Sequence, residues 1–221
     1  GDTSINATEI RTTFFNGDLT REFGGRVLKW LPEASKRFLA EFRHSTEYFE
    51  LVGEWQRERN YVKEWGKGPF LTADAVVIQS GHLLVVERGG ELGRGKIALP
   101  GGHLNPDESL DQCAVRECFE ETRLFEHEPD MERRAQLLWQ GFRGRHIFDD
   151  PHRSCRARVI TEAFLFKLPD AYSLPPVNVP MFPVNGADDA KRAFWMPLKD
   201  VKPESMFEDH GFIVQKMLRY L

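Results

Sequence analysis

Apolar residues in the first part of the chain recur at helical spacing. The run "LPEASKRFLAEFRH" repeats apolar residues at intervals of three and four, and Pro32 suits the first turn of a helix. The run from Thr46 to Trp65 has a similar period. A further helix is predicted at "NATEIRTTFF", where Asn6 and Glu9 have capping-box spacing. The apolar face of the first of these runs comprises Ala34, Phe38, Leu39 and Phe42.

After "GKGPF" the apolar pattern changes from helical to strand-like. The runs "LTADAVVIQ" and "HLLVVER" are rich in Val, Ile and Leu and flank a Ser80-Gly81 turn, which predicts a β-hairpin. We therefore predict a short all-helical segment over 1–67 and a mixed α/β domain over 68–221. Further strands are predicted at 97–99, 135–148, 157–168 and 193–196, and helices near 109–122 and 209–220.

Composition narrows the classes of function. A chain of 221 residues that is 41% hydrophobic can bury a substantial core. The net charge of -4, without a block of Lys or Arg, favours neither a nucleic-acid nor a membrane partner, and no apolar run has the length of a membrane span. The three cysteines lack metal-type spacing, which favours reduced thiols in a cytoplasmic protein. The sequence leaves the oligomeric state open, and a homodimer is one possibility.

The first predicted helix of the mixed domain carries crowded acids. Ser109 and Gln112 have the spacing of a helix start, which places Glu117, Glu120 and Glu121 in the last two turns within an arc of about 100 degrees. Each like-charge pair costs about 0.2–0.5 kcal/mol, and acids at a helix C-terminus cost about 0.3–1 kcal/mol more. A bound Mg²⁺ or Mn²⁺ would turn this free-energy cost into a net stabilisation. The alternative is a solvated acidic face.

The spacing around these acids resembles the Nudix box, GX5EX7REUXEEXGU, in which U is an apolar residue. The match starts at Gly102, continues through Glu108 and Arg116, and ends at Leu124. Cys118 stands for the first apolar position. Arg123 is the one departure, because the family has a glycine there that ends the helix with a positive φ. We expect the arginine to cost about 1 kcal/mol or to change the helix exit.

The resemblance implies a Nudix-type α/β/α sandwich with a mixed sheet, and a site that holds divalent metal on a diphosphate. By the same resemblance, Glu117 and Glu121 are principal metal ligands. Glu120 is a further ligand or a water-mediated contact. The carbonyl of Gly101 is a possible additional ligand, and the lack of a side chain at Gly102 lets the backbone approach metal and phosphate.

The resemblance also implies supporting roles. Glu108 pairs with Arg116 and so fixes the loop against the helix. The general base lies outside the box in this family, so the motif does not name it. Asp188 and Asp189 are both candidates, because a loop that leads into a strand can bring a carboxylate over the metals. Glu208 and Asp209 are instead interpreted as caps of the last helix, with Asp209 as the N-cap.

Substrate-binding residues are less sharply indicated. Arg88, at the end of a strand, and Arg156, in "RAR", are candidates to hold phosphate, and each is equally compatible with a surface arginine. Three aromatic residues are candidates to stack a base, although core packing is the alternative for each. They are Trp65, Phe70 and Trp139.

Outside the box, about residues 45–221 resemble the Nudix half of bifunctional nicotinamide mononucleotide adenylyltransferase/ADP-ribose pyrophosphatase proteins. "INATEIR" resembles the ISxTxxR segment of nucleotidyltransferases, with Thr8 and Arg11 retained. No histidine of the sequence stands in an HxGH-type motif. We therefore interpret the chain as the C-terminal part of such a protein, in which residues 1–67 are a remnant of the transferase domain and adenylyl transfer is absent.

This resemblance implies an enzyme of NAD metabolism that hydrolyses ADP-ribose to AMP and ribose 5-phosphate. Three other functions remain open. The first is hydrolysis of NADH, a dinucleoside polyphosphate or an oxidised nucleotide. The second is non-catalytic sensing of ADP-ribose. The third is residual adenylyltransferase activity, which the missing HxGH-type motif disfavours.

Overall fold

The computed structural model describes residues 13–15, 28–66, 68–154, 157–174, 177–179, 181–188 and 190–221. The chain divides into two compact units, Gly1–Gly66 and Lys67–Leu221. The division falls where the sequence pattern changes from helical to strand-like. Of the helices in the described ranges, none has both the length and the apolar character that a membrane crossing requires.

The first unit is helical. The 3-10 helix η2 (Leu28–Trp30) precedes α2 (Glu33–Phe42) and α3 (Thr46–Trp65). The side chain of Ser45 accepts a hydrogen bond from the backbone N–H of Tyr48 at 3.1 Å, which starts α3. Both predicted helices of this region are confirmed. The helix predicted at "NATEIRTTFF" lies mostly outside the described residues.

Aromatic rings form the core of this unit. The hydroxyl of Tyr48 donates to the backbone carbonyl of Phe14 at 3.0 Å, and the Tyr48 ring packs edge-on against Phe14 and Phe42. Leu39 packs against the same cluster. Phe38, which shares the predicted apolar face, is 61% exposed and stacks on the ring of Phe42. The apolar face is therefore only partly buried within the described residues of the unit.

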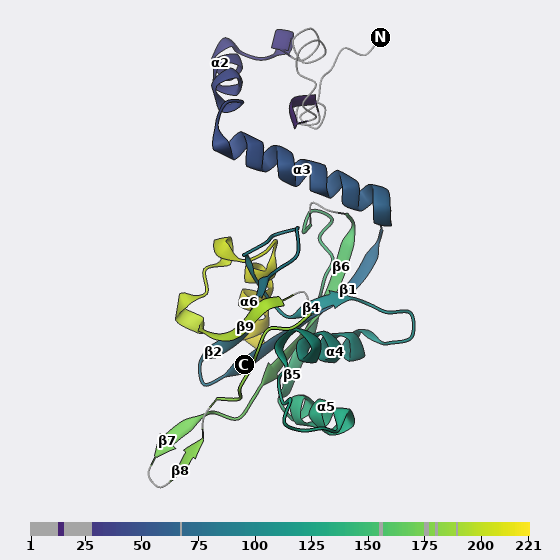
Figure 1. Cartoon of the computed structure of the whole chain (residues 1–221), viewed down its shortest axis with the longest axis vertical. Coiled ribbons are helices and arrows are strands. Elements are labelled where there is room, and N and C mark those ends of the chain that lie inside the picture. The colour runs from purple at the N-terminus through teal and green to yellow at the C-terminus, as the bar shows by residue number, and fades with distance from the viewer. Residues whose placement is uncertain are drawn as a thin grey trace. The chain divides into compact units, whose positions relative to one another are not determined.

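The second unit is a mixed β-sheet with helices on both sides (Figure 1). Strand β1 (Phe70–Gln79) pairs antiparallel with β2 (His82–Arg88) and β4 (Gly101–His103), and parallel with β6 (Val159–Lys167). The predicted hairpin is confirmed. The sheet also contains β3 (Ile97–Ala98), β5 (Phe142–Phe148) and β9 (Ala190–Pro197).

Alternation along β1 separates the core into two layers. Ala73, Ala75 and Val77 pack in one cluster with residues of α4 (Leu110–Thr122) and α5 (Met131–Gln140). Val76 and Ile78 pack in the other cluster with residues of α6 (His210–Met217). This period-two burial on both faces builds the sandwich. The predicted architecture, an α/β/α sandwich with a mixed sheet after a short helical segment, is confirmed.

The prediction of a strand over 135–148 is wrong in its first half. Residues up to Gln140 lie in α5, and β5 starts only at Phe142. The side chain of Asp130 accepts hydrogen bonds from the backbone N–H groups of Glu132 and Arg133, and this cap fixes a helix start that the apolar pattern did not reveal. Trp139 packs its ring against Phe164 and Phe166 of β6, as the core alternative requires.

The remaining elements connect the sandwich. Between β6 and β9, β7 (Tyr172–Leu174) and β8 (Val177–Val179) pair antiparallel in a separate two-stranded sheet, which was not predicted. After β9 the 3-10 helices η3 (Leu198–Asp200) and η4 (Pro203–Ser205) lead to α6, and η5 (Leu218–Tyr220) follows it. The predicted helix near 209–220 therefore ends in a 3-10 turn.

Candidate active site

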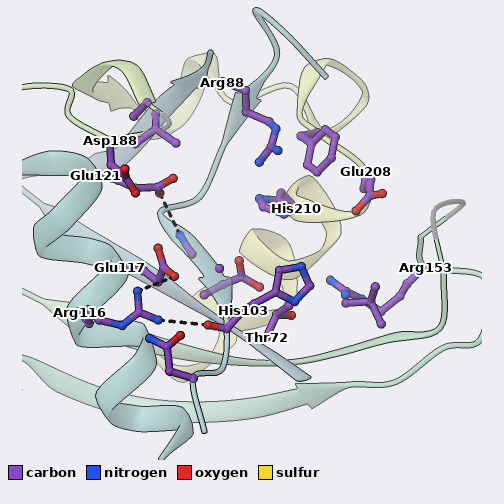
Figure 2. A pocket seen from close by; sticks show the side chains of 18 residues that line it. Thr72, Arg88, His103, Arg116, Glu117, Glu121, Arg153, Asp188, Glu208 and His210 are labelled. Atoms are coloured by element: carbon purple, nitrogen blue, oxygen red, sulfur yellow. Dashed lines mark hydrogen bonds and ion pairs between the residues drawn. The ribbon is translucent and has the colours of Figure 1, made fainter. Parts of the chain in front are cut away.

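A cavity of about 310 Å³ opens at the point where α4, β1, β2 and β4 meet the start of α6 (Figure 2). Acidic and basic side chains both line it. The acids are Asp74, Glu117, Glu121, Asp188 and Glu208. The basic side chains are Arg88, His103, Arg116, Arg153 and His210.

Capping interactions place α4, the helix that carries the box acids. At its start, the backbone N–H of Ser109 donates to Oε1 of Gln112 at 2.9 Å, as the capping-box spacing predicts. At its end, Arg123 adopts the left-handed conformation, with φ 52° and ψ 27°. The helix thus exits as a glycine would allow, and the arginine accepts strain of about 1 kcal/mol.

Arg116, at the cavity wall, is the centre of an ion-pair network. Its Nε and Nη2 donate to the two carboxylate oxygens of Glu108 at 2.9 and 2.7 Å. Its Nη1 lies 2.8 Å from both Glu117 and Glu120, and Nη2 also donates to the carbonyl of His103 at 3.1 Å. The hydrogen bonds from Arg116 lower the pKa of Glu108 to about 2. This network ties the loop before α4 to the helix.

Glu120 differs in position from the other acids of α4. Its side chain is 47% exposed, lies on the outer side of the helix against Arg116, and is not part of the cavity wall. Of the three crowded acids, Glu117 and Glu121 therefore line the cavity and Glu120 does not, although Nη1 of Arg116 contacts both Glu117 and Glu120. The positive charge of Arg116 offsets the negative charges of Glu117 and Glu120, a role that the sequence analysis gave to a metal cation.

Glu121 and Glu117 face the cavity instead (Figure 2). The carboxylate of Glu121 accepts a hydrogen bond from the backbone N–H of Gly101 at 3.1 Å. Burial raises the pKa of Glu121 to about 8, and the negative charges of Glu117 and Asp74 act in the same direction. Burial also raises the pKa of Glu117, although Arg116 opposes this. Both carboxylates are thus held where their ionised forms are costly.

Two glycines let β4 pass close to these acids. A Cβ atom at Gly101 would lie 2.3 Å from Oδ1 of Asp74, and one at Gly102 would lie 2.2 Å from Oε1 of Glu117. Any side chain at these positions would therefore displace a carboxylate. The backbone carbonyl and amide groups of β4 come close to the acids because no side chain intervenes.

The donor set fits a hard divalent cation in chemistry. Glu117, Glu121 and Asp188 offer carboxylate oxygens to one cavity, and oxygen ligands are what Mg²⁺ and Mn²⁺ prefer. Over the described ranges, no three Asp, Glu, His or Cys side chains already stand close enough to hold a metal ion. The ion pair between Glu117 and Arg116 is one reason, since it turns that carboxylate toward the guanidinium.

Backbone hydrogen bonds hold the loop before β9 against the end of α4. The N–H of Asn185 donates to the carbonyl of Thr122 at 2.9 Å, and the N–H of Ala187 donates to that of Glu121 at 3.2 Å. Asp188, the next residue, has a φ of 51° and lines the cavity. The structure therefore brings Asp188 to the acids of α4. Asp189 lies outside the described residues.

Of the two predicted phosphate-binding arginines, Arg88 lines the cavity and Arg156 lies outside the described residues. The Nε of Arg88 donates to the carbonyl of Leu92 at 3.0 Å, and its guanidinium lies 4.1 Å from the centre of the Phe207 ring. These contacts fix the side chain at the cavity wall. Of the other aromatic candidates, Phe70 packs edge-on against His103.

Asp209 is the N-cap residue of α6, as predicted, but its side chain makes no capping hydrogen bond. Both of its oxygens instead accept from Arg153, at 2.8 and 3.0 Å. Glu208 accepts from the hydroxyl of Ser154 at 2.7 Å and lines the cavity. The side chains of these two acids therefore bind the loop between β5 and β6.

Three wall residues were not singled out from the sequence. Arg153 is one of several arginines in "HRSCRAR", and only tertiary packing distinguishes it. His210 accepts a hydrogen bond at Nδ1 from the backbone N–H of Leu99 at 2.9 Å. Asp74, 5% exposed, accepts from the hydroxyl of Thr161 at 2.6 Å. The carboxylate of Asp74 inside the apolar run "LTADAVVIQ" could have indicated a functional residue, since acids are rarely buried unless they are paired.

Comparison with known proteins places this site in a family. A family model described as NUDIX domain matches residues 68–217. The ADP-ribose pyrophosphatase of Methanocaldococcus jannaschii is 26% identical over 152 residues, which are 69% of this chain and 75% of that protein.

Solved structures agree with the family match. The structure of a bifunctional NMN adenylyltransferase/ADP ribose pyrophosphatase from Francisella tularensis, complexed with AMP and a Mn ion, is 33% identical with a TM-score of 0.76. The match covers 98% of this chain and 61% of that one, so this chain spans about three-fifths of the Francisella protein. The NUDIX domain of Shewanella oneidensis NrtR, complexed with ADP ribose, shares the fold at 20% identity and a TM-score of 0.50, over 73% of this chain and 97% of that one.

The family model covers more than half of the chain and includes every acid of the box. Its match begins within two residues of the boundary between the two compact units. The chain therefore belongs to the NUDIX family of hydrolases.

Proposed function

We propose that the NUDIX domain hydrolyses ADP-ribose to AMP and ribose 5-phosphate with the help of a divalent cation, Mg²⁺ or Mn²⁺. One observation carries the proposal. Glu121 is buried and Glu117 is partly buried against a single cavity, in the box motif, and burial raises the pKa of each. The named activities of the Methanocaldococcus and Francisella relatives support the choice of substrate.

Glu117 and Glu121 are the proposed principal ligands of the cation, with the carbonyl of Gly101 as an additional ligand. Glu120 contributes from the outer side, directly or through water. When bound, the cation neutralises the diphosphate and lowers the pKa of an attacking water. The open backbone at Gly102 leaves room for the phosphates beside Glu117.

The supporting residues have separate proposed tasks. Glu108 and Arg116 hold the loop and α4 in fixed register through their two-pronged ion pair. Asp188 or Asp189 takes the proton of the attacking water, and the position of Asp188 on the cavity wall supports the first of these. Arg88 and Arg156 bind phosphate oxygens of the substrate.

We also propose that residues 1–67 correspond to part of a nucleotidyltransferase domain and residues 68–221 to the NUDIX domain. The match to the Francisella structure supports this, because it covers 98% of this chain and therefore includes the helical unit. Adenylyl transfer is not part of the proposed activity.

The test is hydrolysis by the purified protein with Mg²⁺ or Mn²⁺, followed as AMP release. ADP-ribose is compared with NADH, a dinucleoside polyphosphate and an oxidised nucleotide, and the Glu121→Gln variant is the control. We expect AMP from ADP-ribose with the unmodified protein and none above background with the variant. If only another nucleotide is hydrolysed, that nucleotide replaces ADP-ribose as the proposed substrate. Tight ADP-ribose binding without any turnover would indicate a sensor.

A further inference from the structure

His210 is the first residue of α6, and its ring lines the cavity that contains the box acids (Figure 2). The residue is 8% exposed. Its Nδ1 accepts a hydrogen bond from the backbone N–H of Leu99 at 2.9 Å. A backbone N–H can only donate, so Nδ1 carries no proton and the neutral ring has its proton on Nε2. The contact with Leu99 thus fixes the tautomer.

The surroundings keep this ring neutral. Burial lowers the pKa of His210, and the charge of Arg153 acts in the same direction. The carboxylates of Asp74, Glu208 and Asp209 oppose the shift without reversing it. The side chain is therefore a neutral group with one fixed donor, Nε2–H.

This donor has no protein partner in the part of the chain that the structure describes. The hydrogen bond from Leu99 engages Nδ1, and the ring otherwise makes an edge contact with Phe207. A donor inside a partly enclosed cavity gains free energy when a ligand oxygen accepts from it, because leaving it unpaired on ligand binding is costly.

The position of the ring relative to Glu121 follows from a shared backbone segment. The N–H of Leu99 donates to His210, and the N–H of Gly101 donates to Glu121. These two N–H groups are two residues apart, which is at most about 7 Å along an extended chain. His210 and Glu121 therefore accept hydrogen bonds from the two ends of one short segment. A substrate diphosphate bound at Glu121, as proposed, would lie close to His210.

We infer that Nε2–H of His210 donates a hydrogen bond to a diphosphate oxygen of the bound substrate, which makes His210 a substrate-binding residue of the site. The inference rests on the proposed function, since it takes the diphosphate from there. The competing role is purely structural: His210 would serve only to anchor Leu99.

Two substitutions separate these roles. Asparagine places an oxygen where His210 has Nδ1, so His210→Asn keeps an acceptor for Leu99 and loses the donor that reaches the cavity. Glutamine is longer and places an amide nitrogen near the position of Nε2, so His210→Gln keeps a donor and loses the acceptor. The readouts are thermal unfolding and calorimetric binding of the α,β-methylene analogue of ADP-ribose, with AMP and ribose 5-phosphate as further ligands.

We expect His210→Asn to weaken binding of the analogue about 10- to 100-fold, as for loss of one hydrogen bond to a charged oxygen. Its unfolding temperature should stay within about 2 °C of the unmodified protein, because the anchor is kept. His210→Gln should bind within about fivefold of the unmodified protein and unfold about 2–6 °C lower. AMP and ribose 5-phosphate, which lack the diphosphate, should bind almost equally to all three proteins.

Normal binding by His210→Asn, together with a lowered unfolding temperature in His210→Gln, would overturn the inference in favour of the structural role. A loss seen equally with ribose 5-phosphate would overturn the assignment to the diphosphate. If the unmodified protein hydrolyses another nucleotide and not ADP-ribose, the substrate proposal fails, and the same comparison on that nucleotide still decides the role of His210. A protein that hydrolyses and binds none of these ligands would overturn both proposals.

Discussion

The box holds glutamates in opposite electrostatic states on its outer side, away from the cavity, and on its inner side, which lines the cavity. On the outer side, Glu108 in the loop before α4 is paired with Arg116, and the pKa of Glu108 is lowered to about 2. On the inner side, Glu121 has a backbone N–H as its hydrogen-bond donor, lies near other acids, and its pKa is raised to about 8. The outer pair stabilises the fold. The inner acid costs stability in the protein alone, so its charge is explained by something that binds beside it.

The largest expected effect tests the inner side. Glu121→Gln keeps an acceptor for the N–H of Gly101 and removes a ligand charge, so we expect kcat/KM for ADP-ribose to fall by about 10³-fold or more. Glu120→Gln is the matched control on the same helix. Because Glu120 is half-exposed and outside the cavity wall, its loss should be about tenfold or less. Equal losses of kcat/KM in the two variants would show that the inner and outer glutamates do not differ in function.

The next effect concerns the general base. Asp188→Asn should lower kcat by about 10²–10⁴-fold and remove the acidic limb of the pH–rate profile. Glu208→Gln serves as the control, because that carboxylate also lines the cavity but is engaged by Ser154. Full activity in Asp188→Asn would move the base assignment to Asp189.

A smaller effect tests the outer side through stability. The folded-state pKa of Glu108 lies below its unfolded value, so its contribution is present above about pH 4.5 and is lost as the pH falls toward 2. After allowance for solvent screening, Glu108→Gln should cost about 1–2 kcal/mol at pH 7. Denaturant unfolding at pH 7 and pH 3 measures it. A variant whose deficit is as large at pH 3 as at pH 7 would contradict the ion-pair account.

The smallest effect concerns the end of α4, next to the inner acids. Arg123→Gly should stabilise the protein by about 0.5–1 kcal/mol, because glycine adopts the left-handed conformation without strain. Arg123→Ala removes the same exposed ion pair with Glu126 and keeps a Cβ atom, so it should not stabilise. Thermal unfolding compares the two variants. Equal shifts would show that strain at this position is negligible.

Local patterns predicted much of the molecule. The helical run up to Trp65, the hairpin around Ser80 and the capped start of α4 each depend on neighbours in sequence, and each is present in the structure. The strand predicted over 135–148 failed because Leu137, Leu138 and Trp139 are apolar in either a strand or a buried helix face.

Local patterns predicted only part of the candidate site. Glu117, Glu120 and Glu121 lie within five residues of one another, so their spacing reveals them. Asp74, Arg153 and His210 come from three distant segments and meet only because β1, the loop after β5 and the start of α6 pack around one cavity. The position of the Glu120 side chain outside the cavity was also not predictable. It depends on the ion pair with Arg116, and the sequence does not show which acids Arg116 contacts.

The central claim is that the inner acids of α4 are tolerated because they bind a divalent cation. The most direct test is the unfolding temperature of the unmodified protein and Glu121→Gln, each in chelator and in Mg²⁺. In chelator we predict that the variant is the more stable of the two, since it buries no ionisable group at residue 121. Mg²⁺ at about 100 times its Kd should raise the unmodified protein by about 5–10 °C and reverse the order. No shift of the unmodified protein with Mg²⁺ or Mn²⁺ would contradict the account.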